Sequence, residues 1–399
     1  MHNIRICMNQ RELFFRHVAQ TSPTPIALEI KKAKGIKLTT QTGQKFYDLI
    51  AGISVCNVGH RHPAVLKAIK KQLDQYLHLL VYGEIIETPQ VQYAKLLASH
   101  LPEALQTIYF TNSGAEATEG AMKLAKRVTG RTEIIAFNQS YHGSTQGALS
   151  IIGDEYWRNA FRPLLPGIHH CEYGSQEAID AINTQTACVI AETVQAEKGV
   201  FAPTKEWMQA LRTKCTETGT LLVLDEIQTG FGRTGTLWGF EAYDIVPDII
   251  LLGKALGGGM PLGAFVASQE HMRSLTADPV LGHISTFGGH PVSCAAGMAA
   301  MQVLFKEKMI SRVPSLAALF KESLQHPAIR EIRSAGLLMA IQLESAEKVQ
   351  AVIAACVKAG LLTDWFLFAA DCLRIAPPLS ITEKEIRKIC SILCSCLDA

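Results

Sequence analysis

The sequence predicts an α/β protein in which helices cover a mostly parallel sheet, with a smaller α+β unit beside it. The first observation is that short apolar or β-branched runs alternate with longer amphipathic runs between residues 107 and 268, as strands and crossover helices do. The second is that 48% of the 399 residues are hydrophobic and 19% are charged. Such a chain can bury a large core and is not intrinsically disordered.

The individual elements follow from the lengths and flanks of these runs. Short apolar runs predict strands at Thr107–Phe110, Glu133–Phe137, Cys188–Glu192, Leu221–Glu226, Asp248–Leu252 and Gly263–Ala267. Longer amphipathic runs between them predict helices, for instance at Ala115–Val128 and Lys205–Glu217. We expect these helices to pack on the faces of one sheet.

The pattern changes after a helical stretch at Pro291–Phe305, which indicates a second structural unit. The expected elements are a helix near Pro314–Leu324, a strand around Leu337–Leu343, a helix at Glu347–Ala359 and a last helix from the Thr382 and Glu385 capping box to about Cys394. Near the start, Lys31–Phe46 predicts a hairpin with Gly43 at its turn and no core of its own. We therefore predict a large domain at 48–301 and a small one made of 1–47 and 302–399.

Charge and hydropathy exclude several classes of partner. The net charge is +2 at pH 7 and no long basic run occurs, so neither nucleic acid nor an anionic membrane surface is an expected partner. The most apolar region is interrupted by Lys254, and no run approaches the roughly 18 apolar residues of a membrane span. The first 20 residues lack the apolar segment of an export signal.

The cysteines predict a reducing compartment and no metal site. Eleven cysteines, an odd number without an export signal, indicate reduced thiols that pack as small apolar groups in a cytoplasmic protein. Neither HExxH nor CxxC occurs, and Cys390, Cys394 and Cys396 follow helical spacing. A structural zinc ion is therefore not expected.

Residues 111–115, Thr-Asn-Ser-Gly-Ala, follow a predicted strand and open a predicted helix. Small residues at a helix N-terminus leave backbone N–H groups free to bind a phosphate, and Ser113 would add a hydroxyl. The plainer interpretation is that Ser113 only caps the helix.

Asp225 and Glu226 end the most apolar predicted strand. Ligands of open α/β sheets bind beyond the carboxyl ends of the strands, so a carboxylate there is placed to meet a cofactor, although a solvated strand end would look the same. Residues 230–235 literally match the dinucleotide pattern GxGxxG. The following residues are too rich in glycine and aromatic side chains for a crossover helix, which argues against dinucleotide binding.

Lys254 directly follows another apolar strand. A nucleotide P-loop would need glycine at 248 and Ser or Thr at 255, where the chain has Asp248 and Ala255. A lone lysine in this apolar context is unusual for a solvated face. An amine in a desolvated pocket has the lowered proton affinity that covalent chemistry with a carbonyl requires.

Taken together, these motifs resemble those of the class III pyridoxal-phosphate aminotransferases, which include acetylornithine, ornithine and 4-aminobutyrate aminotransferases. Tyr141-His142-Gly143 follows the Asn-Ser-Gly-Ala segment, and Lys254 lies 29 residues after Asp225. The resemblance extends from Gly-His-Arg-His-Pro at 59–63 through Ser-Thr-Phe-Gly-Gly at 285–289 to Leu-Arg-Ile-Ala-Pro-Pro at 373–378.

The resemblance implies the type I pyridoxal-phosphate-dependent fold, a pyridoxal 5′-phosphate cofactor and a homodimer with shared active sites. By similarity, Lys254 would hold the cofactor covalently and then carry the proton between the substrate carbon and the cofactor. Asp225 would keep the pyridine nitrogen protonated, which makes the ring an electron sink.

The resemblance also assigns the remaining cofactor contacts. Tyr141 would stack on one face of the ring and Ile227 would pack on the other, with Gln228 near the phenolic oxygen. His142 belongs to the same cofactor-binding motif. The residues expected at the phosphate are Ser113, Gly114 and Ala115, with Thr286 reaching the site of the neighbouring subunit.

Three charged residues are predicted to bind substrate. Arg374 matches the family arginine that binds the α-carboxylate of glutamate or 2-oxoglutarate, for which a bidentate guanidinium is suited. Glu197 matches the glutamate that pairs with this arginine when an ω-amino donor is bound, and Glu192 lies just upstream. For Glu197 and Arg374 the alternative is an ion pair of little consequence.

The chain departs from the family pattern at several positions. Acetylornithine and ornithine members carry Arg where this chain has Ser144, which argues against acetylornithine as the donor because a guanidinium for the donor carboxylate is missing. Thr193 replaces Pro, His290 replaces Asn, and Tyr141 replaces Phe of some branches. These three changes do not identify a substrate from the sequence.

The resulting functional prediction is an aminotransferase that moves an amino group from an ω-amino acid or amine to 2-oxoglutarate by a ping-pong mechanism. Two alternatives remain open. One is another reaction of the same cofactor, namely that of a racemase, aminomutase or decarboxylase, of which a racemase or aminomutase would consume no oxo acid. The other is a non-catalytic binding protein, which the presence of Lys254 disfavours.

Overall fold

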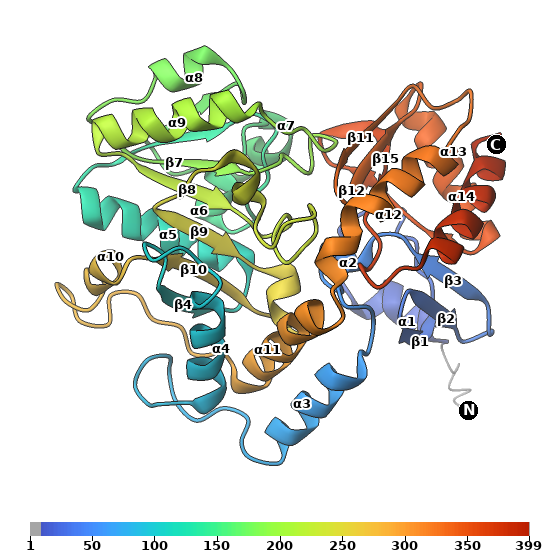
Figure 1. The fold of residues 1–399 in the computed structure, drawn as a ribbon, viewed down its shortest axis with the longest axis horizontal. Coiled ribbons are helices and arrows are strands. Elements are labelled where there is room, and N and C mark those ends of the chain that lie inside the picture. The colour runs from blue at the N-terminus through green and yellow to red at the C-terminus, as the bar shows by residue number, and fades with distance from the viewer. Residues whose placement is uncertain (1–8, 399) are drawn as a thin grey trace, which may run out of the picture.

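The computed structural model describes residues 9–398, which form two lobes side by side (Figure 1). Cys7 and the rest of the first eight residues lie outside the described part of the chain. A seven-stranded sheet forms the centre of the larger lobe. Its order is β4 (Thr107–Thr111), β10 (Gly263–Ala267), β9 (Ile249–Leu252), β8 (Leu221–Asp225), β7 (Thr186–Glu192), β5 (Glu133–Phe137) and β6 (Ile168–Cys171).

Strand β10 is antiparallel to both of its neighbours, and the other strand pairs of this sheet are parallel. The predicted mostly parallel sheet and all six predicted strands are confirmed. Strand β6 was missed because Ile-His-His-Cys is short and half polar, so it lacks the apolar run by which the other strands were found.

The sheet is buried on both faces, as a parallel sheet requires. Every residue of β7 is buried. Val189 and Ala191 belong to one core with α9 (Lys205–Thr218), while Cys188 and Ile190 belong to another with α5 (Gly114–Thr129). Because alternate side chains of a strand point to opposite faces, α5 and α9 cover opposite sides of the sheet.

Capping residues explain where these two helices begin and end. Ser113 accepts a hydrogen bond from the Glu116 N–H at 3.2 Å, and Gly130 ends α5 in the left-handed conformation. Thr204 and Gly219 do the same for α9. Both predicted helices are confirmed, with the hydroxyl N-caps and glycine C-caps that sequences of this kind favour.

Further helices lie in and around the larger lobe, except α1, which lies with the smaller lobe (Figure 1). They are α1 (Gln10–His17), α2 (Ala51–Ser54), α3 (Pro63–Leu73), α4 (Thr88–Ala98), α6 (Gln146–Ser150), α7 (Glu155–Arg158), α8 (Gln176–Asp180), α10 (Gln269–Arg273), α11 (Pro291–Lys306) and the 3-10 turns η1 (Asn159–Phe161), η2 (Gly239–Tyr243) and η3 (Lys254–Gly257). Helix α11 confirms the predicted helical stretch, and η2 is a 3-10 turn, not the crossover helix that dinucleotide binding needs.

The smaller lobe contains two four-stranded sheets and, besides α1, three helices (Figure 1). One sheet has the order β1 (Ile30–Lys34), β2 (Lys37–Thr40), β3 (Lys45–Asp48), β13 (Leu361–Leu362) and the other β11 (Glu331–Ala335), β12 (Leu338–Gln342), β15 (Ala369–Ile375), β14 (Trp365–Phe366). The helices are α12 (Met309–Ser323), α13 (Ala346–Ala359) and α14 (Glu383–Leu397). Strand β13 pairs in parallel with β3, so segments more than 300 residues apart share a sheet.

Two elements of this lobe differ from their predictions. The predicted single hairpin at Lys31–Phe46 is a three-stranded meander, because Gly35 forms a second turn in addition to the one at Gly43. The predicted helix near Pro314 begins earlier, at Met309, so Pro314 lies inside α12. Proline is more often found in the first turn of a helix, which is why the sequence alone placed the start there. The Thr382 and Glu385 capping box of α14 is confirmed.

Arg233 joins the two lobes from inside the molecule. Its fully buried guanidinium donates to the carbonyl oxygens of Leu337 and Pro377 at 3.0 and 2.6 Å and to the Asn57 side chain at 2.5 Å. The Gly-rich segment that superficially matches a dinucleotide motif therefore carries a structural contact to the smaller lobe. Its glycines form turns around this arginine.

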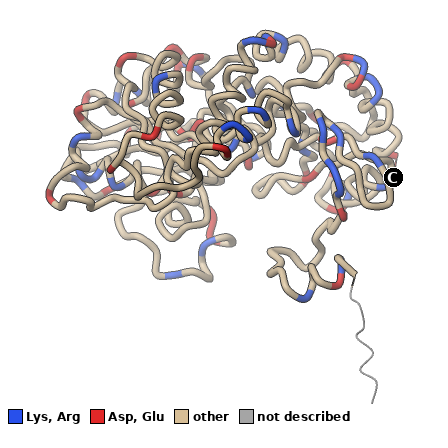
Figure 2. Tube along the Cα trace, turned by 90° about the horizontal axis from the view of Figure 1, so that it is seen from below, with Lys and Arg blue, Asp and Glu red and all other residues tan. Residues whose placement is uncertain are grey.

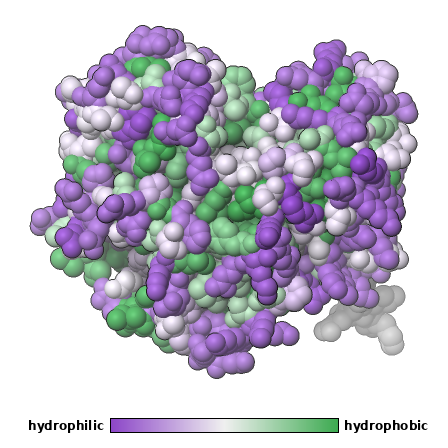
Figure 3. Space-filling model, viewed as in Figure 1, coloured by the Kyte–Doolittle hydropathy of each residue, from purple (hydrophilic) through white to green (hydrophobic). Residues whose placement is uncertain are grey.

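Charged residues of both signs are interspersed along the trace (Figure 2). A notch separates the two lobes at the upper edge of the view in Figure 3.

Among residues 9–398, no helix is long and apolar enough to cross a membrane, and no group of three or more His, Cys, Asp or Glu side chains is arranged to hold a metal ion. The ten cysteines of this part of the chain are free thiols.

Candidate active site

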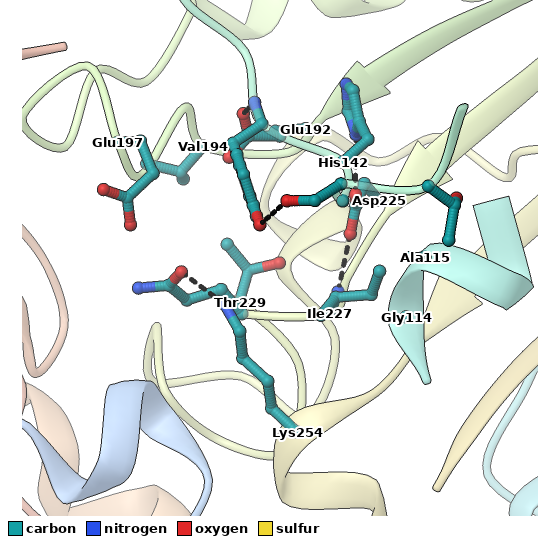
Figure 4. A pocket seen from close by; sticks show the side chains of 15 residues that line it. Gly114, Ala115, His142, Glu192, Val194, Glu197, Asp225, Ile227, Thr229 and Lys254 are labelled. Atoms are coloured by element: carbon teal, nitrogen blue, oxygen red, sulfur yellow. Dashed lines mark hydrogen bonds and ion pairs between the residues drawn. The ribbon is translucent and has the colours of Figure 1, made fainter. Parts of the chain in front are cut away.

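A cavity of about 440 Å³ lies where several strands of the large sheet end (Figure 4). Asp225 is the last residue of β8, Glu192 is the last residue of β7, and Lys254 follows β9 by two residues. These strands are parallel, so their carboxyl ends meet at one edge, where ligands of open α/β sheets bind. The lining residues are Gly114, Ala115, Tyr141, His142, Gly143, Ser144, Thr145, Glu192, Val194, Glu197, Asp225, Ile227, Gln228, Thr229 and Lys254.

Lys254 points its amine into this cavity and donates a hydrogen bond to Gln228 Oε1 at 2.6 Å. Its backbone has a φ of +46°, a conformation that a lysine adopts only where the surrounding structure imposes it. Burial lowers the pKa of the amine, although the Glu197 and Asp225 carboxylates oppose part of the shift. A larger neutral fraction makes the amine a better nucleophile.

Asp225 and His142 form a buried pair on the opposite wall. Asp225 Oδ2 lies 2.7 Å from His142 Nδ1, and Oδ1 accepts a hydrogen bond from the Ile227 N–H at 2.9 Å. Burial alone would lower the pKa of His142, but the hydrogen bond and charge of Asp225 raise it overall. A carboxylate held in this way stays in one orientation, which suits it to pair with a cationic ring nitrogen.

Glu192 anchors the loop that carries Tyr141. Its two carboxylate oxygens accept hydrogen bonds from the backbone N–H groups of Tyr141 and Ala196 at 3.1 and 2.9 Å. Burial raises the pKa of Glu192 to about 7. The residue lines the cavity, as predicted for a substrate contact, but it also holds backbone in place.

The first turn of α5 closes another side of the cavity. A Cβ on Gly114 would lie 2.7 Å from Ile227 Cδ1, and one on Gly143 would lie 2.5 Å from the Ala115 Cβ. Because the two glycines have no side chain, the backbone packs closely here and the N-terminal N–H groups of the helix remain accessible to an anion. The predicted phosphate residues Gly114 and Ala115 line the cavity, whereas Ser113 does not, and its hydroxyl caps the helix.

At the other end of the cavity, Glu197 meets Arg374 from strand β15. Glu197 Oε1 and Oε2 accept hydrogen bonds from Arg374 Nη1 and Nη2 at 2.8 and 2.9 Å. The pair is almost entirely buried. Burial by itself would raise the pKa of Glu197, but Arg374 lowers it overall. The two residues are 177 positions apart, and their predicted pairing is present in the structure.

Thr286 lies elsewhere, exposed in the segment between α10 and α11, and does not line the cavity of its own chain. Three lining residues were missed by the sequence reasoning, namely Thr145, Val194 and Thr229. Thr229 follows Gln228 directly and Thr145 follows Ser144, so proximity to the motifs was the available signal for both. Val194 gave no chemical signal.

The side chains of the cavity fit pyridoxal phosphate. A nucleophilic lysine suits the aldehyde, a fixed carboxylate suits the pyridine nitrogen, and the helix N-terminus suits the phosphate, all within one cavity of suitable volume. The fold and site thus define a pyridoxal-phosphate-dependent enzyme of fold type I.

Comparisons with known proteins identify the family. The model of the family described as aminotransferase class-III matches residues 18–397. The chain is 38% identical to the acetylornithine aminotransferase of Methanopyrus kandleri, over 98% of this chain and all of the relative, and 38% identical to that of Bacillus subtilis, over 92% and 94%. A solved ornithine aminotransferase from Toxoplasma gondii superposes with a TM-score of 0.89 at 30% identity, over 96% of this chain and 92% of the other.

The chain belongs to the class III aminotransferases, and it is a pyridoxal-phosphate-dependent aminotransferase. The family predicted from the motifs is therefore confirmed.

Proposed function

We propose that the enzyme moves an amino group from a primary amine or ω-amino acid to 2-oxoglutarate in two half-reactions that share one cavity. The observation that carries the proposal is the Glu197 and Arg374 ion pair at the end of the cavity that also holds Lys254. A guanidinium that is released by its glutamate can bind a substrate carboxylate in the same bidentate manner. When the pair stays closed, the same space accepts a substrate without that carboxylate.

The bound cofactor supplies an electron sink for the carbanion formed at the substrate carbon. Lys254 would bind the cofactor covalently and, once displaced by the substrate amine, move the proton at the reacting carbon. Its lowered pKa and its place inside the cavity support both roles. Asp225, fixed by His142 and the Ile227 N–H, would keep the ring nitrogen protonated.

The remaining predicted contacts are also part of this proposal. Tyr141 and Ile227 would flank the ring, Gln228 would lie near its phenolic oxygen, and Gly114 and Ala115 would bind the phosphate. Glu192 remains a predicted substrate contact. The hydroxyl of Ser113, which caps α5, would have to serve both the helix and the phosphate.

We also propose that the enzyme acts as a homodimer in which Thr286 reaches the partner's phosphate site. Two segments of the larger lobe lie against each other, since the His78 and Phe287 rings are 4.8 Å apart and the Tyr82 N–H donates to the Ser285 carbonyl. Both segments expose large apolar side chains, namely Leu77, Leu79, Leu80, Ile86, Val280, Leu281, Ile284 and Phe287. A contiguous surface of this kind is typical of a protein interface.

The similar enzymes named above act on acetylornithine and ornithine, as their names state. Ser144 bears on whether this chain shares those donors. Its hydroxyl lines the cavity and lies 3.1 Å from the Tyr141 hydroxyl. Because a hydroxyl pair replaces the expected guanidinium there, a donor that needs a cation for its carboxylate is disfavoured. We therefore propose an ω-amino acid or amine instead of acetylornithine.

The test is the absorbance spectrum of the cofactor-loaded enzyme before and after L-glutamate is added without any oxo acid. We expect the band of the lysine-linked cofactor to be replaced by that of its amine form, with release of 2-oxoglutarate. A persistent band would reject 2-oxoglutarate as the acceptor and favour another reaction of the cofactor, in which no oxo acid is consumed. The Lys254→Ala variant serves as the control, since it should lack the starting band.

A further inference from the structure

Glu197 lines the substrate end of the cavity and contacts Arg374, which also contacts Asp364, so two acids share a single base next to the cavity. Arg374 is bound by Glu197 through Nη1 and Nη2, and its Nε lies 2.9 Å from Asp364 Oδ1. The Nε–H is not aligned with that oxygen, so the second contact is an ion pair instead of a straight hydrogen bond. All three side chains are largely shielded from solvent, with exposed fractions of 7% for Glu197, 3% for Arg374 and 18% for Asp364.

The other partners of Arg374 do not balance this charge. Its Nη2 also donates to the Trp365 carbonyl at 2.9 Å, and its guanidinium lies over the Phe366 ring at 4.3 Å. Both partners are neutral. The cluster of Glu197, Arg374 and Asp364 therefore has one surplus negative charge when all three groups are ionised.

Neighbouring charged groups do not neutralise the surplus negative charge of this cluster. Asp48, at the end of β3, also acts on Asp364, but it is paired with His60 at 2.6 Å, and this hydrogen bond raises the pKa of His60 to about 10. Lys254 also acts on Glu197, but its amine is hydrogen-bonded to Gln228 and would be bound to the cofactor in the loaded enzyme. A carboxylate that displaces Glu197 to bind Arg374 therefore also experiences the charge of Asp364, which contacts the same guanidinium.

The opposite wall, as formed by the described residues, adds no basic side chain that is free to pair with this end. Among the fifteen lining residues, all in the described part of the chain, the basic side chains are Lys254 and His142, and His142 is paired with Asp225. Tyr141, Ser144 and Thr145 contribute hydroxyl groups. These groups can form hydrogen bonds to an amine, an ammonium or a carboxylate, but because they are neutral they do not offset the charge of Asp364.

We propose that Asp364 determines substrate specificity. Its carboxylate favours donors whose end remote from the reacting amine is neutral or cationic, namely primary amines and diamines. This inference rests on the proposed function and narrows its donor class. Asp364 acts at a distance on every substrate that reaches Glu197: it repels a carboxylate and attracts an ammonium. In the other half-reaction, glutamate or 2-oxoglutarate binds Arg374 through a carboxylate. The charge of Asp364 weakens this binding relative to a site that contains Arg374 without Asp364.

The protonation of Asp364 gives a second way to observe this effect. Burial raises the pKa of Asp364 to about 6, although Arg374 opposes the shift. Asp364 is therefore mostly protonated at pH 5 and mostly ionised at pH 7. As the pH rises through this range, the surplus charge appears and the KM for glutamate should increase.

The experiment measures both half-reactions in the cofactor-loaded wild type and in Asp364→Asn. Asparagine has nearly the same size and lacks the charge. The substrates are L-glutamate, 1,4-diaminobutane and butylamine, the last two differing by one terminal ammonium. We expect Asp364→Asn to lower the KM for glutamate and raise that for the diamine, each by roughly fivefold, and to change the KM for butylamine by less than about twofold.

Asp371→Asn is the matched control, because Asp371 lies on β15 three residues before Arg374 and contacts Gln342 instead of the cluster. It should leave all three KM values unchanged. The increase in the glutamate KM between pH 5 and pH 7 should also be larger in the wild type than in Asp364→Asn. Because both proteins contain the other titrating groups, the difference between them reports on Asp364.

Opposite shifts for the two charged substrates would not result from a general loss of structure, which would impair all three reactions. Equal shifts for glutamate and diamine, or no shift, would overturn the role of Asp364. A wild type that reacts with glutamate but with neither amine would overturn the donor class while leaving the glutamate half-reaction intact. If glutamate alone fails to react, the proposed acceptor is wrong, and the diamine and butylamine comparison still tests Asp364.

Discussion

The two ends of the cavity are built in different ways. The inner end, with Lys254, Asp225 and Glu192, is assembled at adjacent strand ends of one buried sheet. The outer end joins Glu197 of the larger lobe to Arg374 and Asp364 of the smaller lobe. A change in the position of one lobe would therefore alter the outer end and leave the inner end unchanged. The groups proposed to hold the cofactor thus lie on one sheet, and the groups proposed to exchange partners lie across the junction of the lobes.

This difference gives the largest prediction at the inner end. Lys254→Ala should lower turnover with every substrate by at least roughly 10⁴-fold, because both covalent attachment and proton movement depend on the amine. The measurement is kcat for an amine and for glutamate, together with the absorbance spectrum of the cofactor. A similar loss for both substrates is expected. Turnover near the wild-type rate with either substrate would refute the assignment.

At the outer end the loss should depend on the substrate. Arg374→Gln removes the bidentate guanidinium, and kcat/KM for glutamate should fall by about 100-fold. A donor without a carboxylate should lose less than about fivefold, because it does not bind the guanidinium. This second substrate is the internal control. Equal losses for both would mean that Arg374 is a structural residue and that the two ends do not differ in function.

A smaller effect on stability tests how tightly the inner end is packed. Gly143→Ala should destabilise the protein by about 3 kcal/mol, since its φ is +129° and the new Cβ would overlap Ala115. Gly43→Ala is the control, with a φ of +88° and open space around the new atom, and should cost about 1 kcal/mol. Urea unfolding of both variants measures the difference. If both substitutions lower the free energy of unfolding by the same amount, Ala115 and its helix can move to accommodate the new atom.

The same contrast explains what could be predicted from the sequence. The strand that ends at Asp225 and the strand that precedes Lys254 are continuous apolar runs, so their ends could be located from hydropathy alone, and the chemistry of the residues at those ends could be recognised. Pairing of Glu197 with Arg374 came only from family resemblance, because no local pattern relates residues 177 positions apart. Asp364 gave no signal, since its importance arises from strand β15 placing Arg374 beside it.

Elsewhere, predictions failed where tertiary contacts outweigh local pattern. Strand β6 is short and half polar, and it is recognisable as a strand only through its pairing with β5. Arg233 was taken as part of a misleading glycine motif, yet its guanidinium is buried between lobes by three hydrogen bonds to residues far away in sequence. A buried arginine of this kind cannot be distinguished from an exposed one without the positions of its acceptors.

The pairing of β13 with β3 has a consequence for synthesis on the ribosome. All seven strands of the large sheet lie between residues 107 and 267, so they can assemble while the remainder of the chain is still being translated. The early strands β1 to β3 must wait for Leu361 and Leu362 before their sheet is complete. Arg374 leaves the ribosome later still. The nascent enzyme can thus complete the sheet that carries Asp225 before the proposed substrate-binding residue Arg374 has been synthesised.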